Sequence, residues 1–130
     1  MIVLDASAVV ELLLDSPKGE RVRARISRTV TLHAPHLLDL EVAQALRRYE
    51  RVGTLSPERA RGALSDLSDM PVERYPHDPL LPRIWALRRN ATAYDAAYLA
   101  LAEALEAPLL TADARLGSVP GHDARVEVLV

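Results

Sequence analysis

Short runs of β-type residues alternate with longer helical patterns along the whole chain. The runs are Ile2 to Leu4, Val30 to His33, Val72 to Tyr75, Leu109 to Thr111 and Val126 to Leu129. This alternation is typical of βαβ units, in which helices cover the faces of a parallel sheet. The first and fourth runs are continuously apolar, as expected for central strands that are covered on both faces. The sequence therefore predicts an α/β domain with a mostly parallel central sheet flanked by helices (α/β/α).

Segments with helical spacing of apolar residues separate these runs. They are Val42, Ala45, Leu46 and Tyr49; Ala60, Ala63, Leu64 and Leu67; and Ala97, Tyr98, Leu101, Ala102 and Leu105. Such spacing indicates amphipathic helices whose apolar faces turn toward the core. The third segment is rich in alanine and has no interior glycine or proline, which favours a helix. Ser56 followed by Pro57 predicts a helix start, because serine caps helices and proline fits their first turn.

Length and composition limit the kinds of protein that this chain can be. Its 130 residues, 49% of them apolar, fit a single domain over residues 1–130. The chain contains no cysteine, which excludes disulfides, thiolate nucleophiles and cysteine-based metal sites. The N-terminal segment has no basic leader and is interrupted by Asp5, and no apolar run approaches the ~20 residues of a membrane span. We therefore expect a cytoplasmic protein with no membrane partner.

The charge pattern gives a weaker indication. The net charge of -2 argues against nucleic-acid binding through overall positive charge. Arginines nevertheless cluster, as in Arg47, Arg48 and Arg51, and arginine suits contacts with phosphate. The favoured interpretation of each cluster is a solvated helix face with acidic neighbours.

Two aspartates directly follow the predicted central strands. Asp5 comes after the first apolar run, and Asp113 comes just after the fourth. Open α/β sheets bind ligands at the carboxyl ends of their strands, so adjacent parallel strands would bring these two carboxylates together. Aspartate is also a common helix cap, which is the structural alternative for each residue.

Two further acids lie near predicted helix starts. Glu41 begins the helix of Val42, with Asp39 as a nearby rival, and the helix dipole favours an acid there in any case. Thr92 and Asp95 match a capping box, which explains an acid at Asp95 by structure alone. The neighbours of Asp95 are largely apolar, however, and a carboxylate among them resists ionisation unless a cation or donors compensate it.

Four converging carboxylates would repel one another, and a bound divalent cation removes that repulsion. Oxygen ligands favour Mg²⁺ or Mn²⁺ over zinc. The histidines show no helical H-x-x-x-H spacing, and we interpret them as surface or structural residues: His33, His36, His77 and His122. The sequence therefore predicts a magnesium or manganese site built from carboxylates.

Four segments resemble the signature segments of the PIN-domain family and occur in the family's order. They are MIVLDASAVVELLL, LLDLEVAQALRR, ATAYDAAYLALAEAL and PLLTADARL. Within the family, the short chain and the second and third segments are most similar to VapC-type toxins of toxin–antitoxin pairs. The resemblance implies a Mg²⁺- or Mn²⁺-dependent endoribonuclease with an RNA substrate and products that carry 5′-phosphate and 3′-hydroxyl ends. It also implies a cognate antitoxin protein, a toxin homodimer and a higher toxin–antitoxin assembly.

The resemblance further implies roles for particular residues. Its catalytic carboxylates correspond to Asp5, Glu41, Asp95 and Asp113. The three aspartates correspond to metal ligands, and Glu41 to a ligand or a residue that positions water. The small hydroxyl positions that support metal, water or phosphate correspond to Ser7 and Thr111. With no cysteine and no convincing Ser/His/Asp set, water is the expected nucleophile.

Other functions remain open at this stage. A receiver-type magnesium-binding domain requires paired acids after its first strand, but Asp5 stands alone there. A haloacid-dehalogenase-type phosphatase requires a D-x-D start, but Asp5 is followed by Ala6 and Ser7. A non-catalytic module could use the acidic pocket only to receive basic segments of a partner. Arg115 could contact an RNA backbone, but a solvated loop arginine is the favoured interpretation, and we leave it out of the predicted site.

Overall fold

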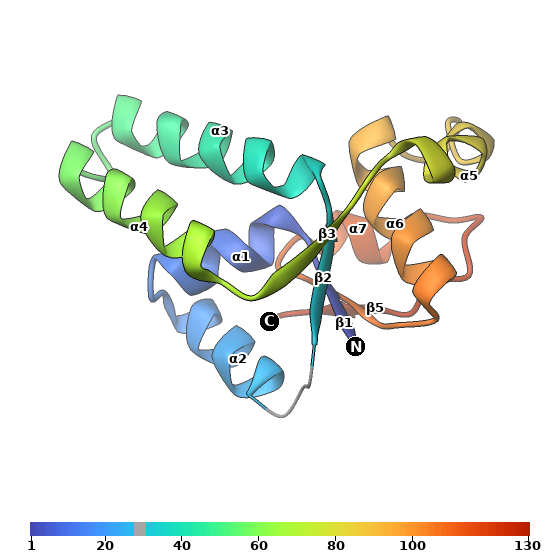
Figure 1. The fold of residues 1–130 in the computed structure, drawn as a ribbon, viewed down its shortest axis with the longest axis horizontal. Coiled ribbons are helices and arrows are strands. Elements are labelled where there is room, and N and C mark those ends of the chain that lie inside the picture. Colours follow the sequence, from blue (N-terminus) through green and yellow to red (C-terminus); the bar gives the residue numbers. More distant parts are fainter. Residues whose placement is uncertain (28–30) are drawn as a thin grey trace.

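The computed structural model describes residues 1–27 and 31–130 and contains a five-stranded sheet with helices on both faces (Figure 1). The strands are β1 (Ile2–Leu4), β2 (Leu32–Pro35), β3 (Val72–Tyr75), β4 (Leu109–Thr111) and β5 (Val126–Val128). They lie in the order β3-β2-β1-β4-β5, and every neighbouring pair is parallel. The predicted α/β fold is confirmed, with a sheet that is parallel throughout.

The central strand β1 is covered on both faces. Ile2 and Leu4 belong to one apolar cluster and Val3 to the other, as expected from the alternation of side chains along a strand. In β4, Leu110 belongs to the first cluster and Leu109 to the second. Each strand thus requires apolar residues at successive positions, which explains the continuous apolar runs in the sequence.

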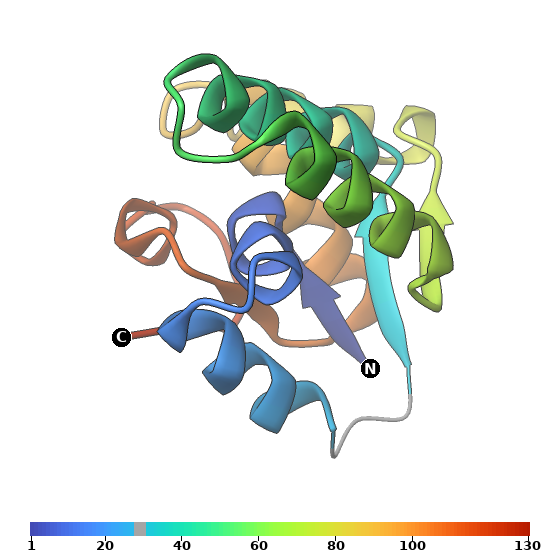
Figure 2. The same ribbon diagram turned by 90° about the vertical axis from the view of Figure 1, so that its left-hand side faces the viewer.

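The helices form two layers on either side of the sheet. One layer contains α1 (Ala6–Leu13), α2 (Pro17–Ile26), α3 (Leu37–Arg51) and α4 (Pro57–Asp69), and the other contains α5 (Leu81–Ala86) and α6 (Ala93–Leu105) (Figure 1). A 3₁₀ turn (Asp78–Leu80) precedes α5, and α7 (Ala114–Gly117) follows β4. Figure 2 shows α3 and α4 side by side as a pair that extends over α1. No helix in the described residues is long and apolar enough to span a bilayer.

Local signals place the starts of α4 and α6 where the sequence predicts them. The Ser56 hydroxyl accepts the N–H of Arg59 at 3.1 Å, with Pro57 in the first turn of α4. The Thr92 hydroxyl likewise accepts the N–H of Asp95 at 3.1 Å at the start of α6. The middle of α6 is buried on every side, and its alanines allow the sheet and α5 to approach closely.

Several predicted details are wrong. The second strand runs from Leu32 to Pro35 rather than from Val30 to His33, and Val30 lies outside the described residues. The strand continues to Pro35 because Ala34 and Pro35 pair with Arg74 and Tyr75 of β3. The buried His33 side chain has partners in the Tyr75 and Thr31 hydroxyls at 2.6 and 2.7 Å. This contact gives His33 a structural role.

Two further predictions miss by small margins. The last strand ends at Val128, one residue before the predicted end at Leu129. Leu64 shares the helical spacing of the buried Ala60 and Ala63, yet it is 43% exposed. The face that α4 buries is narrower than the spacing implies, and Leu64 lies at its solvent edge.

One carboxylate joins α6 to α5 and to the C-terminal segment. Glu103 accepts two hydrogen bonds from the Arg83 guanidinium, at 2.8 and 2.9 Å, and one from the backbone N–H of Asp123 at 2.7 Å. The hydrogen bonds from Arg83 are the main cause that lowers the pKa of Glu103. This contact links three segments through a side chain that is only 15% exposed.

We predict that Glu103→Gln lowers the free energy of unfolding at pH 7 by about 1 kcal/mol, a modest value because Arg83 stays 39% exposed. A carboxylate with a lowered pKa stabilises the fold above its unfolded pKa of about 4.3, and this contribution is lost as pH falls through the folded pKa. Urea unfolding curves should therefore show the difference from wild type shrinking below pH ~4.

The matched control for this prediction is Glu106→Gln. Glu106 is an exposed acid at the end of the same helix and has no ion pair within residues 1–27 and 31–130. The control should unfold like wild type at both pH values. An equal loss of stability in the two variants would contradict a specific role for Glu103.

Candidate active site

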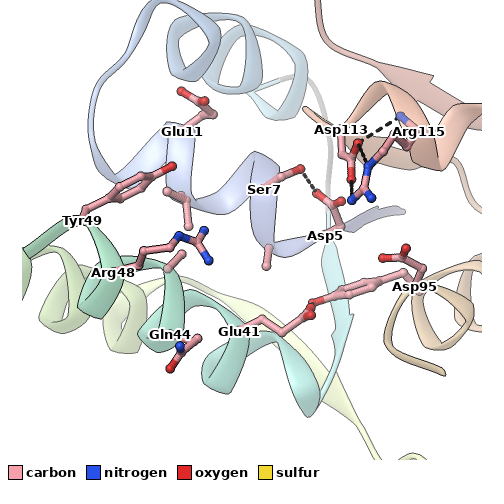
Figure 3. Close-up of a pocket in the computed structure, with 14 residues that line it drawn as sticks. Asp5, Ser7, Glu11, Glu41, Gln44, Arg48, Tyr49, Asp95, Asp113 and Arg115 are labelled. Carbon is pink, nitrogen blue, oxygen red and sulfur yellow. Dashed lines mark hydrogen bonds and ion pairs between the residues drawn. The ribbon is translucent and has the colours of Figure 1, made fainter. Parts of the chain in front are cut away.

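A pocket of about 360 Å³ opens at the carboxyl ends of β1 and β4 (Figure 3). Its wall contains all four predicted carboxylates, namely Asp5, Glu41, Asp95 and Asp113. The strands β1 and β4 are adjacent and parallel, so Asp5 and Asp113 reach the same edge of the sheet. The other two acids come from α3 and α6, which pack on opposite faces of that sheet.

Asp5 forms the floor of this pocket and is only 6% exposed. One carboxylate oxygen accepts hydrogen bonds from the Ser7 hydroxyl at 2.7 Å and from the N–H of Ala8 at 3.0 Å. The other accepts a hydrogen bond from the Thr111 hydroxyl at 2.6 Å. Burial raises the pKa of Asp5, the charge of Asp113 adds to this rise, and the three hydrogen bonds oppose it. The carboxylate caps α1 and belongs to the pocket at the same time.

Ser7 and Thr111 connect α1 to the end of β4. Besides their bonds to Asp5, the Ser7 hydroxyl accepts the N–H of Ala112 at 2.9 Å, and the Thr111 hydroxyl accepts the N–H of Asp113 at 2.9 Å. These bonds orient the carboxylate of Asp5 and the backbone that leads to Asp113. The two hydroxyl residues singled out in the sequence therefore lie in the site.

The sequence-based placement of Glu41 at a helix start is wrong, because α3 begins four residues earlier at Leu37. The ring nitrogen Nε2 of His77 accepts the N–H of Leu37 at 2.9 Å, which satisfies one of the free N–H groups of the first turn. Glu41 consequently lies one turn further along the helix, where its side chain reaches the pocket. The rival Asp39 instead pairs with Arg74 at 2.8 and 2.9 Å, away from the pocket wall.

Tyr98 holds Glu41 in place. Its hydroxyl donates to Oε1 of Glu41 at 2.7 Å from a side chain that is only 2% exposed. Burial raises the pKa of Glu41, and the charges of Asp95 and Asp5 add to it, whereas the Tyr98 hydrogen bond lowers it. The helical spacing predicted only a core position for Tyr98. Its hydroxyl indicates a polar contact as well, because the O–H of a buried tyrosine needs a hydrogen-bond partner.

Asp95 and Asp113 differ in their electrostatic surroundings. Burial raises the pKa of Asp95, and the charge of Asp113 adds to the rise. The pKa of Asp113 is lowered, chiefly by hydrogen bonds from the Arg115 side chain at 2.9 and 3.3 Å. Arg115, which we left out of the predicted site, therefore lies in the pocket wall and neutralises part of its charge.

The residues of the pocket fit a hard divalent cation through their chemistry. As the side chains stand, no three histidine, aspartate or glutamate groups in the described part of the chain are arranged to hold one ion together. Magnesium, however, commonly uses one or two carboxylates and keeps several waters. The raised pKa of Asp5, Glu41 and Asp95 reflects burial and mutual repulsion that a cation would relieve.

Comparisons with known proteins identify the family of this chain. The family model described as PIN domain matches residues 2–121. Ribonuclease VapC1 of Mycobacterium tuberculosis (strain CDC 1551 / Oshkosh) is 44% identical over 128 residues, which cover 98% of this chain and 96% of the relative. Ribonuclease VapC12 of the same strain is 42% identical over 129 residues, 99% of each chain. The crystal structure of PAE2754 from Pyrobaculum aerophilum aligns with a TM-score of 0.66 at 30% identity, covering 96% of this chain and 82% of that one.

We predict that Tyr98→Phe raises the pKa of Glu41 further, because the variant lacks the hydrogen bond that favours the charged carboxylate. It should also lower the free energy of unfolding by about 1 kcal/mol. Carboxyl ¹³C titration by NMR and urea unfolding measure the two effects. Tyr49→Phe is the control, since Tyr49 lines the same pocket and its hydroxyl has no hydrogen bond among the described residues. An unchanged Glu41 pKa in Tyr98→Phe would refute the role of the hydroxyl.

Proposed function

Because this chain belongs to the PIN-domain family and is of the VapC type, we propose that it is a metal-dependent endoribonuclease and the toxin of a type II toxin–antitoxin pair. The observation that carries the proposal is the convergence of Asp5, Glu41, Asp95 and Asp113 on one pocket. The relatives named ribonuclease VapC1 and VapC12 match nearly the whole chain, which supports the same type of reaction here.

We propose Mg²⁺ or Mn²⁺ as the cofactor, with Asp5, Asp95 and Asp113 as the residues that would hold it. When bound, such an ion lowers the pKa of a coordinated water and neutralises charge on the phosphoryl oxygens. The hydroxyls of Ser7 and Thr111 keep the Asp5 carboxylate in a fixed orientation through bonds of 2.7 and 2.6 Å. A ligand that is already oriented loses less conformational entropy on binding.

Glu41 is the residue that we assign to the attacking water. Its raised pKa makes it a better proton acceptor than an exposed glutamate, and Tyr98 fixes the direction of its carboxylate. Water attacks phosphorus while its proton passes to Glu41, and the bond to the 3′ oxygen breaks. The leaving 3′ oxygen takes up a proton from solvent water, and Glu41 later returns its proton to solvent, so the products carry 5′-phosphate and 3′-hydroxyl ends.

The resemblance to VapC-type toxins also supports two protein partners. We propose a cognate antitoxin that covers the carboxylate pocket and keeps the enzyme inactive, and a homodimer of the toxin itself. An antitoxin arginine suits this pocket, because a guanidinium pairs with carboxylates through two hydrogen bonds. Size-exclusion chromatography with light scattering, with and without a co-expressed antitoxin candidate, tests both assemblies.

The receiver-type alternative fits the sheet poorly. Receiver-like sheets place the third strand beside the first, which brings its acid to the site. Here β3 is an edge strand separated from β1 by β2. A non-catalytic acidic pocket remains the second candidate, and it predicts partner binding without RNA cleavage.

We predict that Asp95→Asn and Asp5→Asn each lower the rate of RNA cleavage by at least about 100-fold, because each removes a charge that the reaction needs. Mixed RNAs incubated with Mg²⁺, Mn²⁺ or EDTA measure the effect, and EDTA should abolish cleavage by wild type. Asp66→Asn, an exposed acid on α4, is the control and should cleave normally. Wild-type rates from Asp95→Asn, folded by circular dichroism, would overturn the proposed function.

A further inference from the structure

The lining of the pocket carries an excess of negative charge. Five acids line it, and the described lining residues include two cations, Arg48 and Arg115. An RNA strand carries a negative charge on every phosphate and is repelled by a cluster of carboxylates. Positive groups at the rim are therefore needed to bring the strand to Asp5.

Arg48 is suited to this role by its direction and because no acid in the described part of the chain pairs with it. Figure 3 shows its side chain extending from α3 into the pocket, on the opposite side of Asp5 from Arg115. Its guanidinium carbon lies 5.8 Å from the centre of the Tyr49 ring, and it has no carboxylate partner within residues 1–27 and 31–130. Arg74 and Arg83, by contrast, are paired with acids.

The neighbouring Arg47 provides an internal comparison. It is exposed on the same helix but lines a different groove between α3 and α4. Successive residues of a helix point about 100° apart, which separates the two guanidinium groups. One arginine of the pair therefore faces the carboxylates and the other does not.

Arg115 lies on the other side of Asp5 and is 86% exposed. Its side chain directs Nε and one hydrogen of Nη2 at Asp113, and a guanidinium has five N–H donors, so three remain for a ligand. Arg115 and Asp95 also line a second cavity of about 380 Å³ whose wall includes Asn90 and Ser118. Arg115 thus lies between the pocket and the cavity beside it.

We propose that Arg48 and Arg115 hold the phosphates on either side of the scissile bond, and that the strand continues past Arg115 into the second cavity. This inference rests on the proposed ribonuclease function. The ligand is an unpaired strand, because Asp5 is 6% exposed and a phosphodiester must enter the pocket to reach it. A guanidinium suits each contact, since its planar donors match phosphate oxygens.

The test measures RNA binding separately from cleavage. An Asp95→Asn background prevents turnover, and fluorescence anisotropy follows a fluorescein-labelled, unstructured RNA in magnesium buffer. We expect Arg48→Ala and Arg115→Ala each to weaken binding about 10-fold, and each to reduce the slope of log affinity against log salt by about 0.7. Arg47→Ala, the matched control, should change affinity less than about 2-fold. Arg48→Lys should restore part of the affinity, because it keeps the charge.

Several results would overturn the inference. Equal loss in Arg47→Ala would show that only diffuse positive charge attracts the RNA. If Arg48→Ala or Arg115→Ala bound the RNA with unchanged affinity, the substituted residue would not contact the strand. In the enzyme with Asp95 intact, Arg115→Ala could lower kcat without raising KM. That result would show that Arg115 acts only by holding Asp113 and does not contact the RNA. If Asp95→Asn itself cleaves like wild type, the proposed function fails, whatever the arginines do.

Discussion

The burial of the Asp5 carboxylate is the constraint on which the rest of the site depends. A charged group at 6% exposure is costly unless donors surround it, and three are present: the Ser7 and Thr111 hydroxyls and the N–H of Ala8. Two of the donors come from α1 and the third from the end of β4. The same bonds that compensate the charge therefore fix the start of α1 against β4. Asp5 therefore joins α1 to β4 and also supplies a carboxylate to the pocket.

The other carboxylates of the pocket differ in their electrostatic environments. Asp95 and Glu41 have a raised pKa through burial and repulsion, whereas Arg115 lowers the pKa of Asp113. Carboxylates of similar chemistry thus have different proton affinities within one pocket.

Structural and functional explanations of the acids turn out to be compatible. Asp5 caps α1, Asp113 caps α7, and Asp95 donates its N–H to the cap residue of α6. These three helix starts also place the carboxylates of Asp5, Asp95 and Asp113 in the wall of the pocket. Capping and a place in the pocket are therefore not alternatives, because one position satisfies both. Their joint occurrence at neighbouring strand and helix ends carried the prediction.

The alternation of strands and helices, the central place of β1 and β4, and the four acids of the pocket could be predicted from the amino-acid sequence. These follow from local patterns, because period-two and helical spacings and runs of buried residues are properties of neighbouring positions. Three features could not be predicted in this way: the choice of Glu41 over Asp39, the partner of the buried Tyr98, and the different surroundings of Arg48 and Arg47. Those choices depend on which face of a helix meets which neighbour, and that is set by packing between segments distant in the chain.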